Sequence, residues 1–206
     1  RFLERYPNLS REVEANLYAV PKNDSLIDYL TYKIIMTSAG IEFVEEEPDK
    51  HGLKNTDGVM RCRERVLLTE KARSYFEHRL GDILQLDYKI ERLVETSDKV
   101  YVNGIPFDFV IDSTWGHLLP TGFNVYYEPT LLLYYRCRER FPALTFVDGP
   151  LCSVYPTEES DIYTLSSVRY TPFGSYLSAH EARAALRKVT DTDVQEKRKQ
   201  MEDQIS

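Results

Sequence analysis

The sequence predicts an α+β fold: a mixed, largely antiparallel sheet of about six strands flanked by helices, with a small β-meander beside it. Two observations indicate this class. Segments with the apolar spacing of a helix occur in both halves of the chain, and short alternating segments bounded by turn residues lie between them. A third observation is Asn103-Gly104, a strong tight-hairpin signal because both central positions of that turn favour positive φ.

The first 83 residues predict a helix-strand-helix order. A helix is expected over 25–39, with N-cap candidates at Asn23, Asp24 and Ser25 and with Gly40 at its end. A short strand over 41–44 and a loop over 48–58 follow. A longer strand is expected over 59–68. Thr69 then opens a helix that ends near Gly81.

The middle of the chain predicts three short strands, at 84–94, 99–102 and 107–114. The run from Phe107 to Asp112 is nearly continuously apolar. Strands covered on both faces have this composition, so we expect this strand to be buried.

A second group of strands is expected between residues 124 and 170, including strands at 143–147, 151–155 and 163–170. Ser178 and Glu181 form a capping box that opens a helix. Thr192 with Gln195 opens a final helix rich in Lys, Gln and Glu. Because this last helix lacks a continuous apolar face, we expect it to be solvated or to dock on something absent.

Composition excludes several classes of function. The 206 residues carry 33 acidic and 26 basic side chains, a formal charge of -7, which argues against sequence-independent nucleic-acid binding. No apolar run approaches the roughly 20 residues that cross a bilayer, so no membrane partner is expected. Three cysteines, none in a Cys-x-x-Cys pair, favour a reducing, cytoplasmic location.

The common motifs of catalytic sites are absent. The nine glycines include no Gly-x-Gly, so the dinucleotide fingerprint and the Walker loop are missing. The four histidines have no zinc-type spacing, and no Gly-x-Ser-x-Gly occurs. We therefore predict no metal site and assign no catalytic residue.

Fifteen tyrosines are the compositional outlier, and many fall in the second group of strands. Tyrosine combines apolar area with a hydroxyl that can orient a ligand, so these strands could line a pocket. The alternative is that the tyrosines form sheet core and edge, which aromatic residues favour in any protein.

Three stretches together resemble the FAD-dependent oxidoreductases of the D-amino-acid oxidase and glycine oxidase superfamily. The resemblance covers residues 10 to 205, in short motifs. They are Tyr18-Ala19-Val20-Pro21 running into Asp24 to Tyr29; Glu64-Arg65-Val66, Ala72 to Phe76, Val100 to Gly104 and Phe109 to Gly116; and Asp148-Gly149-Pro150-Leu151 through Tyr155-Pro156 to Val168-Arg169.

The resemblance implies FAD as the cofactor of the full-length protein. Ser113-Thr114-Trp115-Gly116 is similar to a family motif of the Ala-Thr-Gly kind whose backbone lies against the flavin nucleotide, although the inserted tryptophan departs from it. A segment such as Tyr88-Lys89-Ile90 lies along the adenine in that family. The cofactor-binding residues implied are Lys89, Ile90, Thr114, Trp115 and Gly116.

The family's glycine-rich phosphate site would precede Arg1, and its last flavin-contacting segment would follow Ser206. The chain thus resembles the middle of such an enzyme, and alone we expect it to be inactive and colourless. The implied organisation is 1–83 and 117–190 as substrate domain, 84–116 as a meander of a partial flavin domain, and 191–206 as a C-terminal helix.

The function implied is the substrate-side portion of an FAD-dependent oxidoreductase that oxidises a C–N or C–O bond of a small molecule. Arg169 is the candidate for a two-pronged contact with a substrate carboxylate, with Tyr155 and Tyr163 beside it. The expected partners are a small-molecule substrate and the missing segments of the same enzyme. The alternative is a non-catalytic module that binds a small ligand or a protein on a tyrosine-lined sheet.

Overall fold

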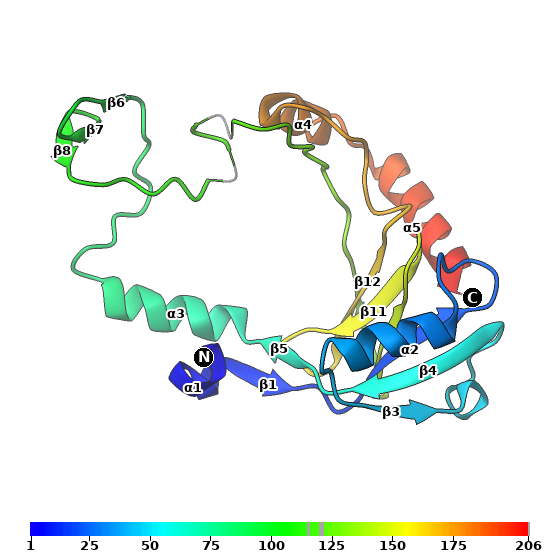
Figure 1. The fold of residues 1–206 in the computed structure, drawn as a ribbon. Coiled ribbons are helices and arrows are strands. Elements are labelled where there is room, and N and C mark those ends of the chain that lie inside the picture. The colour runs from blue at the N-terminus through cyan, green and yellow to red at the C-terminus, as the bar shows by residue number, and fades with distance from the viewer. Residues whose placement is uncertain (115, 120–121, 206) are drawn as a thin grey trace.

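A computed structural model describes residues 1–114, 116–119 and 122–205 and confirms the α+β class. Its centre is a seven-stranded mixed sheet that is mostly antiparallel (Figure 1). The strands, in spatial order, are β3 (Phe43–Glu46), β4 (Thr56–Cys62), β2 (Asn16–Pro21), β10 (Ala143–Phe146), β11 (Cys152–Pro156), β12 (Ile162–Ser167) and β9 (Leu133–Arg136).

The remaining elements surround this sheet. The helices are α1 (Phe2–Arg5), α2 (Tyr29–Ser38), α3 (Thr69–Leu80), α4 (Ala179–Leu186) and α5 (Asp191–Ile205), with 3-10 turns η1 (Pro7–Leu9) and η2 (Pro48–His51). The remaining strands are β1 (Ser10–Glu12) and β5 (Arg65–Leu67), which pair with each other, and the meander β6 (Leu93–Glu95), β7 (Val100–Val102) and β8 (Ile105–Phe107).

The sheet consists of two antiparallel halves, one from each part of the chain. Strands β3, β4 and β2 come from the first 62 residues, and β9 to β12 come from residues 133 to 167. The halves meet where β2 pairs in parallel with β10, with Asn16 opposite Ala143 and Ala19 opposite Phe146. We call this pairing the seam.

Helix α2 covers one face of the first half. Its Met36 packs against Met60 and Cys62 of β4. The helix begins at Tyr29 rather than at residue 25, because the Asp28 carboxylate accepts the hydrogen bond from the Thr31 N–H. The predicted start was therefore wrong by one turn.

Helix α5 covers the opposite face of the second half, which corrects the expectation of a solvated or unpartnered helix. Met201 is fully buried and packs with Cys152 and Leu165. A single fully buried residue, Met201, in a helix of 15 residues is too sparse to give an apolar stripe in the sequence. The helix is capped reciprocally by Thr190 and Asp193, two residues before the predicted pair.

The predicted strand 59–68 is interrupted. Strand β4 ends at Cys62, and β5 leaves the sheet to pair with β1. At its other end β4 begins at Thr56, within the predicted loop 48–58.

The strands in the middle of the chain, β6 to β8, are shorter than predicted. The Asn103-Gly104 hairpin is confirmed, with positive φ at both residues. The predicted buried strand 107–114 was wrong. Strand β8 ends at Phe107, and the side chains of Phe109 and Ile111 are 89% and 90% exposed. An apolar run alone does not bury a strand; a covering layer must exist, and within the described residues none does.

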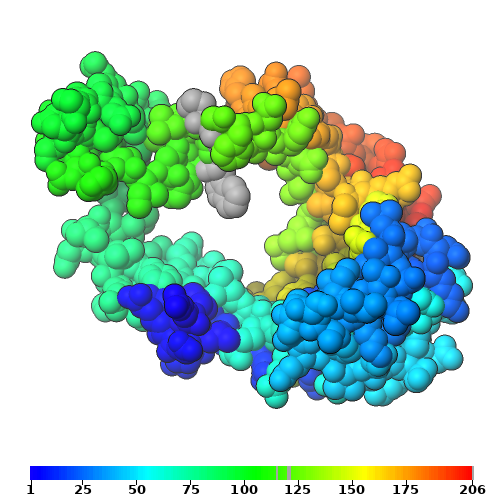
Figure 2. Space-filling view, viewed as in Figure 1, coloured from blue at the N-terminus to red at the C-terminus, as the bar shows by residue number. Residues whose placement is uncertain are grey.

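The chain encloses an opening. In the space-filling view, an opening is bounded by α3, the meander and the chain around α4 (Figure 2). Helix α5 lies on the far side of β11 and β12 from this opening, so the other face of those strands is turned toward it (Figure 1). Across the described residues, we find no helix with both the length and the apolar character to span a membrane.

Candidate functional site

The structure does not bring the three predicted substrate residues together. Tyr155 lies opposite Thr164, whereas Tyr163 lies opposite Pro156, so the two tyrosines point to opposite faces of the sheet. Arg169 follows β12 at the other end of the sheet, next to the Cys152–Ser167 pair. The expectation that β11 would place Tyr155 beside Arg169 was therefore wrong.

Tyr163 and Arg169 have other surroundings. The buried Tyr163 ring stacks on Phe141 with centroids 4.0 Å apart, and its hydroxyl donates to the Phe141 carbonyl at 3.0 Å. The exposed Arg169 guanidinium lies 5.4 Å from the Tyr170 ring centroid and lines a separate cavity of about 660 Å³. Contacts of this kind stabilise folded proteins in general, and they require no ligand.

The residues implied to bind the cofactor lie on the exposed central segment. The Lys89 carbonyl accepts a hydrogen bond from the Asn103 amide at 2.8 Å, and Ile90 is half-buried beside it. The Thr114 hydroxyl donates to Asp112 at 2.6 Å, and Gly116 has a φ of 72°. Trp115 lies outside the described residues. The sequence of this segment contains no Gly-x-Gly phosphate motif.

A different group of residues forms the chemically richest site, on the face of the sheet beside α2. Strand β2 alternates, so that Asn16 and Tyr18 point to this face while Leu17 and Ala19 enter the core on the other. The Tyr18 hydroxyl donates a hydrogen bond of 2.8 Å to Glu64 Oε1. Glu64 lies in the two-residue break between β4 and β5, which places its carboxylate at the end of the sheet.

Two further tyrosines border this carboxylate. Tyr32 comes from α2, with its ring centroid 6.3 Å from that of Tyr18, and Tyr155 comes from β11. Burial, and then the negative charge of Glu64, raise the pKa of Tyr18 and of Tyr155. Burial, then Cys62 and Glu64, raise the pKa of Tyr32 to about 12. All three are therefore neutral hydroxyls near neutral pH.

Two polar groups beside the tyrosines lack full hydrogen bonding within the described residues. Asn16 is 1% exposed, and neither its amide nitrogen nor its oxygen has a hydrogen bond of good geometry, although the side chain approaches Tyr18. The Nε of Arg11 is also buried without a partner, while its Nη2 donates to the Thr157 carbonyl. Unpaired buried polar atoms of this kind require an explanation. We call Asn16, Tyr18, Tyr32, Glu64 and Tyr155 the tyrosine-glutamate cluster.

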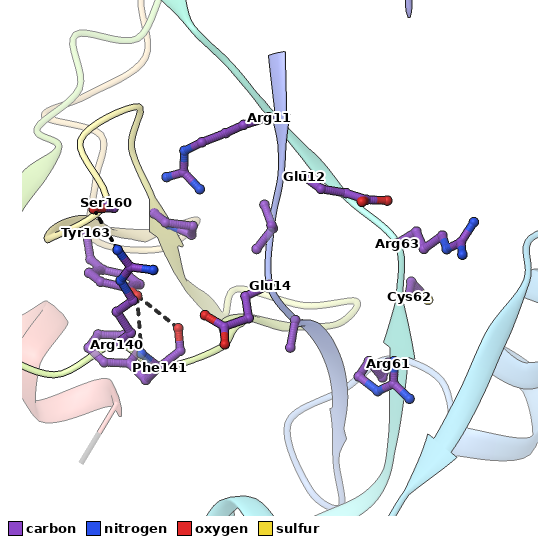
Figure 3. A pocket seen from close by; sticks show the side chains of 13 residues that line it. Arg11, Glu12, Glu14, Arg61, Cys62, Arg63, Arg140, Phe141, Ser160 and Tyr163 are labelled. Carbon is purple, nitrogen blue, oxygen red and sulfur yellow. Dashed lines mark hydrogen bonds between the residues drawn. The ribbon is translucent and has the colours of Figure 1, made fainter.

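A cavity of about 370 Å³ lies at the same end of the sheet, with Arg11 on its wall (Figure 3). Its arginines are mostly engaged: Arg61 binds Glu46 at 2.7 Å, and Arg140 donates to Ser160 at 3.3 Å. Glu14 extends toward Arg140 in the same cavity (Figure 3). The described residues contain no group of three or more side chains suited to a metal ion.

Comparison with known proteins finds similarity to an FAD-dependent monooxygenase. The chain is similar over its whole length to FAD-dependent monooxygenase FPY4 from Fusarium mangiferae, with 52% identity over 205 residues. The chain spans 56% of that relative's length. No family model and no solved structure matches the chain.

Proposed function

We propose that the complete protein is an FAD-dependent oxidoreductase and that this chain supplies most of its substrate side. The observation that carries the proposal is the similarity of the whole chain to part of an FAD-dependent monooxygenase, taken together with a polar, tyrosine-lined sheet face on the side of the sheet opposite α5. The bound flavin would supply the redox chemistry, and the protein would bind and orient the substrate.

Residues of this chain can form part of such a substrate site. The tyrosine-glutamate cluster places neutral hydroxyls and one carboxylate on the sheet face beside α2, a combination that can fix the orientation of a small polar ligand. The central segment of residues 81–126 carries exposed apolar side chains that would pack against the remaining flavin domain. The phosphates would have to be held by glycine-rich residues that this sequence does not contain.

We propose that the complete protein inserts an oxygen atom into its substrate, as the name of the similar FAD-dependent monooxygenase indicates for that protein. Oxidation of a C–N or C–O bond without oxygen insertion, as in the D-amino-acid oxidase superfamily, is the competing activity. Labelled molecular oxygen distinguishes them: the monooxygenase places the label in the organic product, and the oxidase places it in hydrogen peroxide.

The substrate face is tested in the complete protein by perturbation of the flavin absorption spectrum on adding substrate. We expect Tyr155→Phe, on the cluster face, to weaken this response. Tyr135→Phe is the control, because Tyr135 lies on the opposite, α5 face of the sheet, where its hydroxyl donates to Glu202 at 2.6 Å. Equal effects of both variants would contradict the assignment. A complete protein that never retains flavin would favour the non-catalytic binding module.

A further inference from the structure

Two arginines from distant parts of the chain converge on the turn between β11 and β12, residues 157–161. The Nη2 of Arg11 donates to the Thr157 carbonyl, and the Nη2 of Arg140 donates to the Ser160 hydroxyl at 3.3 Å. Both arginines line the cavity of about 370 Å³ at the end of the sheet (Figure 3). We call this cavity the arginine cavity.

The acidic residues of this turn are bound elsewhere. Glu158 lies at the start of α3, where its carboxylate accepts a hydrogen bond of 3.2 Å from the Glu70 N–H. Glu159 and Asp161 both form ion pairs with Arg136. The turn therefore offers the two arginines of the cavity only neutral acceptors.

These two arginines are poorly compensated. Arg11 is half-buried, and its Nε is buried without a partner in the described part of the chain. A guanidinium has five N–H donors, and among the described residues Arg11 and Arg140 each use one. Glu14 extends toward Arg140 in Figure 3, but it is exposed and forms no ion pair with any described residue. Two like charges held at one turn repel each other, and an anion between them would remove that cost.

The lining of the cavity is rich in positive charge, although the chain as a whole is acidic. Four arginines and two glutamates line it, whereas the formal charge of the chain is -7. One of the four, Arg61, is paired with Glu46. Next to Arg140, the 41% exposed ring of Phe141 stacks on Tyr163 and lines the same cavity. An apolar ring therefore borders the cationic groups.

We propose that the arginine cavity binds a small phosphate monoester with an apolar group. Arg11 and Arg140 hold the phosphate oxygens by charge-assisted hydrogen bonds, and Phe141 contacts the apolar group. A phosphate monoester carries a charge of about −1.5 to −2 at neutral pH, which suits two arginines better than a monocarboxylate does. None of the five residues of the tyrosine-glutamate cluster lines this cavity, so the inference does not depend on the proposed substrate face.

The test is calorimetric titration of the complete protein with phenyl phosphate. We expect Arg140→Gln and Arg11→Gln each to weaken binding by about 10-fold or more, the effect of losing one charged hydrogen-bond partner. Arg140 is exposed, so its variant should fold even where that of the half-buried Arg11 does not, and thermal unfolding checks both. Arg138→Gln is the matched control, because Arg138 is exposed, lies two positions away and does not line the cavity. It should leave binding unchanged.

Three related probes identify the ligand class. Phenyl sulfate has a similar shape and less negative charge, so it should bind more weakly than phenyl phosphate. Inorganic phosphate should also bind more weakly, because it has no apolar group to contact Phe141. Equal affinity for inorganic phosphate, or tighter binding of the dicarboxylate phthalate, overturns the assignment to a phosphate monoester.

Two results overturn the site itself. One is that no probe binds the folded complete protein, and the other is that Arg140→Gln and Arg11→Gln both leave binding unchanged. Where no probe binds and Glu14→Gln and Arg140→Gln have non-additive effects on the free energy of unfolding, Arg140 is the structural partner of Glu14. Either failure leaves the proposed substrate face intact, because the flavin spectrum tests that face separately.

Discussion

The seven-stranded sheet buries its apolar side chains, whereas the central segment, residues 81–126, leaves many of its apolar side chains exposed. In the sheet, the central strands β2 and β4 bury residues such as Val20, Val59 and Met60 completely. In the central segment, side chains of the same kind are exposed, including Ile83, Leu86, Phe109, Ile111 and Phe123. The difference shows that composition sets the potential for burial, whereas neighbouring layers decide whether burial occurs. The sheet has its layers, and the central segment has apolar surface left to bury.

The largest test of this contrast compares Met201→Ala with Ile111→Ala. Met201 of α5 is fully buried against β11 and β12, so truncating its side chain should cost about 2–5 kcal/mol in the free energy of unfolding. Ile111 is 90% exposed, so its replacement should change that free energy by less than about 0.5 kcal/mol. Urea denaturation of both variants measures the difference. Similar costs would mean that the central segment is packed after all.

The next test concerns the contact between α2 and the sheet. A Cβ added at Gly58 would lie 2.4 Å from the Tyr29 ring, so Gly58→Ala should cost about 1–3 kcal/mol through overpacking. Combining it with Tyr29→Ala, which removes the ring, should recover part of that loss in a double-mutant cycle. Additive costs would place the strain elsewhere than at this ring.

A smaller and local effect is expected at the meander hairpin. Gly104 has a φ of 87°, so Gly104→Ala should destabilise the meander by about 1 kcal/mol. Because the meander forms a separate sheet, hydrogen exchange should accelerate at β6 to β8 amides and stay unchanged in β2 and β4. Faster exchange throughout would show that the two regions unfold together.

The smallest expected effect is a pH dependence of the stability that Glu46 of β3 contributes to the seven-stranded sheet. Lys50 and Arg61, followed by His51, hold the pKa of Glu46 at about 2, below its ordinary value of 4.5. A lowered carboxyl pKa stabilises the fold above the unfolded value, and that stability is lost as pH falls from about 4.5 toward 2. Glu46→Gln should remove this slope from the midpoint of urea unfolding, whereas Glu47→Gln should retain it.

The sequence predicted the elements whose signals are local. The Asn103-Gly104 turn and the Ser178 cap are confirmed, since each depends on residues adjacent in the chain. The alternating residues Leu131, Leu133 and Tyr135 pack against the same cluster, on one face of the sheet. Alternation within a strand identifies a face without knowledge of what covers it.

The candidate site is formed by residues that are far apart in the sequence and meet only through strand pairing, so local sequence signals could not predict it. Tyr18 and Glu64 are 46 positions apart, and Tyr155 joins them only because β10 and β11 follow β2 across the sheet. Glu64 stood in an alternating stretch that predicted one continuous strand, so its place in a break was hidden. The predicted partners of Arg169 failed for the same reason, because register decides which side chains meet.

The seam between β2 and β10 has a consequence for how the chain folds. It joins residues more than 120 positions apart, so on a ribosome β2 would emerge and pair with β4 long before β10 exists. Until then β2 would be an edge strand with unpaired backbone groups, open to association with other chains. Contacts of such separation slow folding, because loop closure precedes the gain from pairing. A chain cut within the central segment would keep each half of the sheet on one piece, and the two pieces could reassemble at this seam.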